Sequence, residues 1–516
     1  MTLLFNSSLP DPGRRSPRDV GWWAWAGALF LLAPCLVSPA SACTELGVGT
    51  RFWVRLTTPV SSYSAKRGMP VDAELLQSPE CENHAILPIR IPVEGHVVSS
   101  RRVGLGLWHE TATLELEFTR LLPPDAPPIE IQARVLQVEN AREEVKKGVI
   151  HGIRLTDTPQ GTISSRLKYL PSLRLYPDPF LLGYKLLFPI FPEPEICLTP
   201  GTDLQVGLTR AASLPANLPV PTPPPSLQNE QGLDEDLAGL PERTFTPKGK
   251  QADVVNLAFV GSRAQLQQAF AAAGWKQSEP VSRHSVSRSI YAFLIKSSYP
   301  AAPISPQLLD DRVPDLMFER TFDSYEKRDH LRIWSLPPSR DGEELWAGAA
   351  VRETGATLSI RHKGFMHHVS PSLEEEQQIV IRDLMAAYCV DGVGAIERPG
   401  MDHVLLNATG EIFRTDGSLK VLQLKSCAPD PESGEVHEVP RSRPSSKVVR
   451  YVRREVLIVR SDLWRANILY ATFDLAWITA QALHRNSLHR ADLEFFRQSN
   501  QSSLVPGPHP LPQPSE

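Results

Sequence analysis

The sequence predicts a multidomain α+β protein in which a β-barrel or β-sandwich module precedes an α/β domain. Residues 43–212 contain short stretches in which apolar and polar side chains alternate, which is typical of half-buried strands. Residues 213–250 are rich in proline, which predicts an extended linker. From residue 251 onward, apolar strand-like runs and helical patterns interleave, as in an α/β domain. A chain of 516 residues has room for two to four such domains.

Residues 1–42 have the pattern of an export signal. An uncharged apolar run, Val20–Val37, follows three arginines and leads to Ala40-Ser41-Ala42. A basic start, an apolar centre and a small-residue exit predict export to the periplasm or cell envelope, with cleavage after Ala42. An uncleaved membrane anchor is the alternative, since about 18 apolar residues are barely enough to span a bilayer. Lipidation of Cys43 is a further alternative.

Charge and cysteine content exclude several classes of protein. The formal net charge is −4, so nothing indicates nucleic-acid binding. The six cysteines show no CxxC spacing, which argues against a zinc knuckle or a thioredoxin-like pair. We expect neither a resident metal nor another cofactor. In an oxidising compartment, Cys43 and Cys81 are the first candidates for a disulfide.

The β-rich module reads as strands separated by turns that contain glycine or proline. The predicted strands are Arg51–Leu56, His96–Ser100, Thr111–Phe118, Pro128–Val138 and a closing strand at Thr202–Thr209. One insertion, Phe180–Phe191, is apolar apart from Lys185 and too short to span a bilayer. We expect it either to lie on a membrane surface or a partner, or to pack in the core.

The α/β domain is predicted over residues 251–398. Its strands are Val254–Val260, His330–Ser335 and Leu345–Val351, and its helices are Arg263–Ala273, Ser285–Lys296 and Pro371–Cys389. Ser262 and Gly274 are expected to begin and end the first helix.

A C-terminal extension is predicted over residues 399–497. It contains a hairpin at Asp416-Gly417, a strand at Val448–Val459 and a packed helix at Leu463–Leu483. The tail, residues 498–516, is rich in serine and proline and is expected to be disordered.

Residues 252–390 carry short motifs in a fixed order. Among them are Asn256-Leu257-x-x-Val260-Gly261-Ser262, His330-x-Arg332-x-Trp334, Trp346-x-Gly348-Ala349-Ala350 and His367-His368. In this order they resemble the C-terminal domain of LssY-type proteins, which implies a bacterial envelope protein of undefined biochemical activity. Ser370 and Gln377 stand where that resemblance implies an acidic residue and an arginine. More weakly, the spacing of strands and turns in the N-terminal half resembles the β-barrel of TrbI-type conjugation scaffolds.

Polar side chains of the α/β domain form the candidate site for an anion or another ligand. They are Arg312, Asp315, Glu319, His330, Arg332, Trp334, His367, His368 and Glu376. His330, Arg332 and Trp334 alternate along one strand, so they share a face. They either line a pocket for phosphate-like or metal-assisted hydrolysis, or form a polar face whose groups pair with one another.

The function expected from the sequence is that of an exported envelope protein that binds or scaffolds an undefined ligand. The alternatives are a hydrolase that acts on a phosphate- or lipid-bearing envelope substrate, and a secretion-associated scaffold. The expected partner is an envelope protein, a lipid or an anionic ligand.

Overall fold

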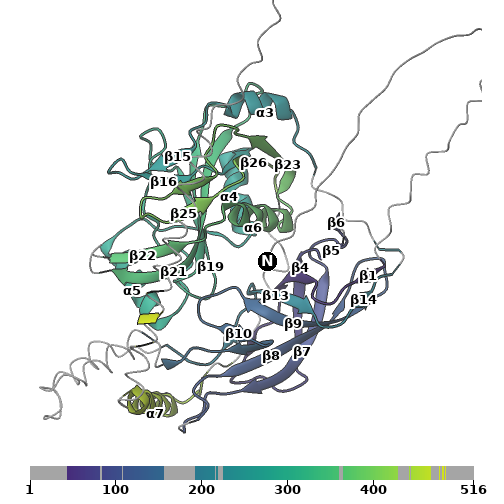
Figure 1. The fold of residues 1–516 in the computed structure, drawn as a ribbon, viewed down its shortest axis with the longest axis vertical. Helices are drawn as coiled ribbons and strands as arrows, with labels where there is room; N and C mark the ends of the chain where they lie inside the picture. The colour runs from purple at the N-terminus through teal and green to yellow at the C-terminus, as the bar shows by residue number, and fades with distance from the viewer. Residues whose placement is uncertain are drawn as a thin grey trace, which may run out of the picture. The chain divides into compact units, whose positions relative to one another are not determined.

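The computed structural model describes residues 44–465 apart from 82–83, 107, 156–157, 159–191, 216, 219–224, 360–363, 428–440 and 442, together with residues 476, 479, 480 and 483. In this part of the chain the protein is mostly β, with five named helices. The predicted fold class is confirmed: a closed β-barrel precedes a mixed sheet covered by helices (Figure 1). No helix in the described ranges is long and apolar enough to cross a membrane.

Six antiparallel strands close the N-terminal barrel, because β8 pairs with both β7 and β9. Around the barrel they are β8 (Thr113–Leu121), β7 (Pro92–Arg101), β4 (Pro70–Gln77), β2 (Arg51–Leu56), β13 (Asp203–Leu208) and β9 (Ile129–Val138). The alternation of apolar and polar residues therefore located these strands correctly, apart from β4. The predicted closing strand, β13, does close the barrel between β2 and β9.

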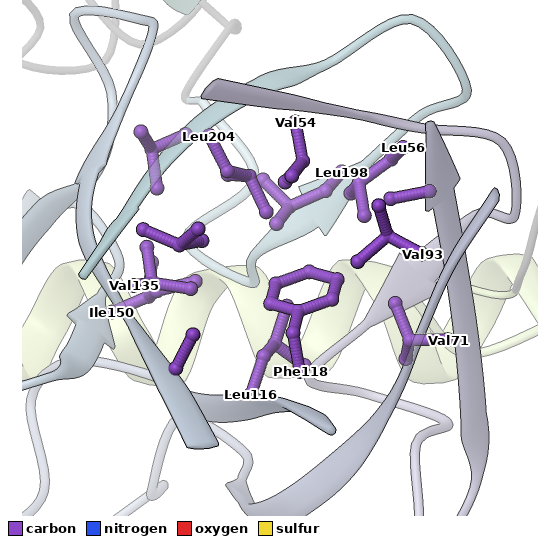
Figure 2. Packing of buried hydrophobic residues seen from close by; sticks show 14 of the residues in the cluster. Val54, Leu56, Val71, Val93, Leu116, Phe118, Val135, Ile150, Leu198 and Leu204 are labelled. Carbon is purple, nitrogen blue, oxygen red and sulfur yellow. The ribbon is translucent and has the colours of Figure 1, made fainter. Parts of the chain in front are cut away.

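Apolar side chains from opposite walls fill the barrel. Figure 2 shows the Phe118 ring in the middle, with Val54, Leu56 and Leu204 on one side of it and Leu116 below. All of these side chains are at most 1% exposed. At about 2 kcal/mol for each fully buried aliphatic or aromatic side chain, this core is the main source of the barrel's stability.

Short strands extend the barrel sheet or form separate two-stranded pairs. β10 (Glu144–Lys146) and β11 (Val149–His151) extend the sheet from β8. The other short strands form pairs: β1 (Glu45–Leu46) with β14 (Ala212–Ser213), β3 (Val60–Ser61) with β12 (Cys197–Leu198), and β5 (Glu80–Cys81) with β6 (His84–Ala85).

The C-terminal sheet is mixed. In spatial order its strands are β18 (Lys276–Gln277), β19 (Leu316–Thr321), β20 (Arg328–Ser335), β21 (Leu345–Ser359), β17 (Leu257–Val260), β26 (Ser418–Leu424) and β23 (Val390–Glu397), and β22 (Gly364–Val369) also pairs with β21. Only β17 and β26 are parallel among the named pairs of this sheet.

Helices cover both faces of this sheet, which explains the continuous apolar run of β17. Leu257 and Phe259 pack with α4 (Arg263–Ala272) and α6 (Leu373–Ala386). Ala258 and Val260 pack on the opposite face with α3 (Glu230–Leu237). The remaining helices are α5 (Arg283–Ile295) and α7 (Lys447–Arg465).

Side-chain caps set the helix starts where the sequence predicts them. Ser262 accepts a hydrogen bond from the Gln265 backbone, and the Gln265 side chain accepts one from the Ser262 backbone, which is a complete capping box. Ser372 begins α6, and three glutamates occupy the first turn of that helix.

Three predicted elements differ in the structure. The run Val254–Val260 divides into β16 (Gln251–Val254) and β17, because the buried Asn256 side chain bonds to the Ala350 backbone at 2.9 and 3.1 Å. The Asp416-Gly417 turn does not form a hairpin, since β26 inserts between β17 and β23. The hairpin pairs β24 (Val404–Leu406) with β25 (Ile412–Arg414) instead.

The third difference is Val448–Val459, which is helical and not a strand. Its β-branched residues favour a strand locally. However, its valines also recur every four residues, at Val448, Val452 and Val456, and Leu457 anchors the helix in the barrel core. Tertiary packing therefore decides the conformation of this segment.

Residues 213–250 contain ordered structure as well as proline-rich chain. Leu233 and Leu237 of α3 are buried against the C-terminal sheet, and β15 (Arg243–Phe245) pairs with β16. The boundaries of the predicted domains stay predictions. Residues 1–42, Phe180–Phe191, the side chain of Cys81, most of Leu463–Leu483 and the tail lie outside the described residues.

One disulfide joins Cys389 and Cys427, which flank β23 and β26 and are 38 residues apart. Replacing both cysteines with serine should lower the free energy of unfolding by about 3 kcal/mol, because the unfolded chain regains the freedom of that loop. Thermal melting with and without reductant measures this change. Cys197→Ser, at the free and half-buried thiol, is the control and should melt like the parent protein.

Candidate functional site

Arg332 lies on β20, which is buried on both faces, and its side chain bonds to groups of the same protein. Its side chain is 3% exposed; Nη1 bonds to the Asp253 carboxylate at 2.7 Å and Nε donates to the Ser305 carbonyl at 3.0 Å. Gln307 also donates to Asp253, at 2.8 Å. Burial by itself would raise the pKa of Asp253, but Arg332 and His330 outweigh it and hold the pKa below its usual range. Arg332 is therefore a partner of the protein's own carboxylate.

His330 also lies among buried charged groups. We call the set Asp253, Arg332, His330, Glu353, Arg328 and Glu319 the row. Its Nδ1 lies 3.2 Å from Glu353 Oε1, and its Nε2 lies 3.9 Å from Asp253 Oδ2. Glu353 in turn accepts a hydrogen bond from Arg328 Nε at 2.6 Å. With its ring 6% exposed between two carboxylates, His330 links two buried ion pairs.

Glu319 ends this row on the neighbouring strand β19. Its two oxygens accept hydrogen bonds from the Ala302 backbone and from Arg328 Nη1, the latter at 3.0 Å. Burial raises the pKa of Glu319 to about 8, although Arg328 opposes the shift. A raised pKa of this kind is a property that acid catalysts share, so Glu319 is the member of the row to test for such a role.

Arg312, Asp315 and Trp334 lie at the other end of β20 and fix the chain there. Trp334 is buried and donates from Nε1 to the Arg312 carbonyl at 3.0 Å. The exposed Asp315 and Arg312 side chains bond to the Ser335 backbone, both at 2.8 Å. Asp315 and Arg332 therefore have different partners, the Ser335 backbone and Asp253.

His368 of the His367-His368 motif contacts a carboxylate outside this row. His368 Nδ1 lies 3.0 Å from Glu411 Oε1, in the segment that follows the β24 strand. The His367 side chain lies outside the described residues.

Glu376 lies in α6, on the other face of the sheet. It is fully buried against Asp329, and neither carboxyl group has a hydrogen-bond partner unless the two share a proton. Burial first, and then the Asp329 charge, raises the pKa of Glu376 well above its ordinary value. Burial likewise raises the pKa of Asp329 to about 6. Glu376 and Asp329 are therefore two buried carboxyl groups whose titrations are coupled, and Arg352 Nε lies 3.6 Å from Asp329.

Ser370 and Gln377, which depart from the LssY-type pattern, have structural contacts. Gln377 Nε2 donates to the carbonyls of Asn256 and Ser418 at 2.7 and 3.1 Å, so it ties α6 to two strands. Ser370 donates to Glu375 at 3.1 Å. The eight predicted site residues with described side chains thus divide among the row on β20, the end of β20, the His368 contact and the Glu376 pair, and these eight do not line one concave surface.

Sequence reasoning missed a cluster of charges between the barrel and α6. Asp203 of β13 and Asp383 of α6 are completely buried, and three arginines surround them. Arg55 bonds to Asp203 at 2.7 Å and to Asp383 at 3.3 Å, and Arg320 bonds to Asp203 at 2.7 Å and also to Asp383. Arg382 reaches both aspartates, at 3.5 and 3.3 Å.

The arginines determine the charge state of this cluster. Burial would raise the pKa of each aspartate, but the guanidinium groups outweigh it and hold both pKa values below their usual range. Nothing in the sequence signals the cluster, because its members lie up to 328 positions apart.

A cavity of about 1000 Å³ borders this cluster. Its wall includes Arg55 and Arg90 of the barrel segment, and Lys276, Glu319 and Arg320 of the C-terminal half. Ala272, at the end of α4, and Tyr388, after α6, also line it. We call this cavity the cluster cleft. In the described part of the chain, no group of three or more His, Cys, Asp or Glu side chains has the geometry of a metal site.

Comparisons with known proteins identify the C-terminal half. The family model described as LssY C-terminus matches residues 237–419. This part of the chain is similar to the LssY C-terminal domain. The match begins at the last residue of α3, and it confirms the resemblance that the sequence motifs carry. No curated protein sequence matches the chain.

Among solved structures, ComB10 of the Com Type IV secretion system of Helicobacter pylori is similar to part of the chain at 11% identity. The match covers 34% of this chain and 92% of ComB10, with a TM-score of 0.19. No function follows from a similarity of this size.

Replacing Arg332 with alanine should lower the free energy of unfolding by about 3 kcal/mol, because Asp253 would remain buried without its cation. Phosphate binding should not change, since Arg332 is not available to a ligand. Thermal melting and phosphate titration of the variant measure the two effects. Arg67→Ala, at an exposed side chain, should change stability by at most about 0.5 kcal/mol. A stable Arg332→Ala protein that has lost phosphate binding would contradict the structural role.

Replacing Glu376 with glutamine should make stability less dependent on pH. The folded protein keeps the Glu376 proton, whereas the unfolded chain releases it above about pH 4.3, so wild-type stability falls as the pH rises beyond that value. Glutamine cannot ionise and can donate to Asp329. We therefore expect Glu376→Gln to raise the melting temperature more at about pH 8 than at about pH 5. Glu375→Gln, at a side chain that is 54% exposed, is the control.

Proposed function

We propose that this protein is an exported cell-envelope protein that binds or scaffolds a ligand at the cluster cleft. The observation that carries the proposal is the cleft itself, a cavity of about 1000 Å³ with barrel residues and LssY-domain residues in one wall. Pockets of this size bind small molecules or segments of a partner. The buried ion cluster beside it supplies a rigid wall.

The state of the polar residues supports binding over catalysis. Arg332, His330 and Arg328 are each occupied by a carboxylate of the same domain. A catalytic base or an anion-binding arginine must instead face the reacting group at hydrogen-bond distance.

Two features support export. The first is the basic, apolar and small-residue order of residues 1–42. The second is the Cys389–Cys427 disulfide, because disulfides persist mainly in oxidising compartments. The ligand is proposed to be a lipid, an anionic molecule or another envelope protein.

A hydrolase is the second candidate, and one observation favours it. Glu319 lines the cluster cleft and carries a raised pKa of about 8, so it could donate a proton to a leaving group at neutral pH. Against this role, both of its oxygens already accept hydrogen bonds from the protein.

Filling the cluster cleft tests the binding proposal. Ala272 lines the cleft, whereas the neighbouring Ala271 is exposed and does not. Native mass spectrometry of protein from the envelope fraction should detect a bound species in wild type and in Ala271→Trp. Ala272→Trp should lose it while keeping its melting temperature. A species retained in Ala272→Trp would contradict the proposed site.

An assay with p-nitrophenyl phosphate separates the hydrolase from the binding protein. We expect no turnover above the uncatalysed rate. Turnover that Glu319→Gln abolishes, in a variant that melts like wild type, would replace the binding proposal with the hydrolase.

A further inference from the structure

Helix α7 turns apolar side chains toward solvent. Val448, Val452 and Val456 recur every fourth residue and are 71%, 53% and 38% exposed. Val449 and Tyr451 beside them are 51% and 58% exposed. A surface helix normally places such a stripe against the core. We call these five residues the α7 apolar face.

The opposite side of α7 is held on the barrel, so the helix cannot simply rotate to bury this face. Leu457 is 2% exposed and belongs to the barrel core. Arg453 bonds to Glu193 and Glu195, both at 2.6 Å. Arg460 is buried and donates to the carbonyls of Gly104 and Gly106.

The flank of α7 is strongly cationic. A cavity of about 600 Å³ runs beside it, and its described lining contains six basic side chains and one carboxylate, Glu193. The basic residues are Arg142, Arg443, Lys447, Arg450, Arg453 and Arg454. Arg453 is paired with glutamates, whereas Arg443 and Lys447 have exposed side chains and no ion pair within the described residues. Tyr291 of α5, which is 48% exposed, completes the wall.

We propose that α7 docks this protein on the surface of a phospholipid bilayer that carries anionic headgroups. The α7 apolar face enters the boundary between headgroups and acyl chains, and the cations of the flank meet the lipid phosphates. A helix with a valine face and a basic flank has the chemistry of an interfacial membrane helix.

The combination of the two features selects a bilayer as the partner. A nucleic acid would satisfy the cations, but its contacts are made through phosphates and base edges, and exposed valines at every fourth position would gain little there. An anionic bilayer offers phosphates and apolar chains within one helix diameter. The docking surface is separate from the cluster cleft, so it stands whether or not that cleft binds a ligand.

Vesicle co-sedimentation of the full exported chain tests the proposal. The protein should bind phosphatidylcholine vesicles that contain phosphatidylglycerol, and binding should weaken as salt rises from about 0.1 M to about 0.5 M. Val448→Asp with Val452→Asp should reduce binding at least about tenfold, because charged groups resist entry into the apolar boundary. Val48→Asp with Val313→Asp, at valines that are 68% and 63% exposed elsewhere, is the matched control and should bind like wild type.

The cationic flank has its own test. Arg443→Glu with Lys447→Glu should also weaken binding by about tenfold or more, since each basic residue near an anionic surface contributes to attraction. Lys248→Glu with Lys250→Glu, at exposed lysines outside the flank, provides the control. Circular dichroism and melting should show that all variants fold.

Three outcomes would overturn the proposal. The first is equal binding of the folded α7 variants and their controls. The second is equally strong, salt-independent binding to pure phosphatidylcholine. The third is a dimer that Val452→Asp dissociates in a protein without vesicle binding, which would assign the α7 apolar face to a second copy of the chain.

Discussion

The ion cluster of Asp203 and Asp383 with Arg55, Arg320 and Arg382 is the constraint on which the rest of the structure depends. Two aspartates without exposed surface would be strongly destabilising if their arginines were withdrawn, since an unpaired buried charge costs several kcal/mol. The cluster is complete only when β2 and β13 of the barrel, β19 of the sheet and α6 are all in place. It therefore couples the order of the barrel to the order of the LssY C-terminal domain, and it forms one wall of the cluster cleft.

Charge burial of this kind recurs through the C-terminal domain. On one face of β20, arginines and His330 pair with carboxylates. On the other face, the carboxyl groups of Asp329 and Glu376 are buried together. The buried carboxyl groups respond to pH in two opposite directions. The aspartates with depressed pKa values lose their stabilising charge in acid, whereas the carboxyl pair is strained by ionisation as the pH rises. Stability is therefore limited on both sides of a central pH range.

The proposed functions do not use the buried polar groups as catalytic residues. The groups that look catalytic in the sequence, above all His330 and Arg332, are used to hold strands and loops together. The surfaces that remain available are the cluster cleft and the α7 apolar face with its cationic flank. The first is proposed to bind a ligand and the second to meet a bilayer, which together describe a protein that positions a ligand at an envelope surface.

The sequence by itself determined the strands of the barrel other than β4, the capped helices α4 and α6, and the LssY C-terminal motifs, because each depends on local periodicity, on caps or on residues close together in the chain. It also placed His330, Arg332 and Trp334 on one face of a strand. Only the tertiary structure decided which carboxylates those residues meet, that Val448–Val459 is helical, and that β26 inserts beside β17. The physical reason is that partners such as Arg55 and Asp383 are hundreds of positions apart, and their pairing is selected by burial in the folded protein rather than by any local pattern.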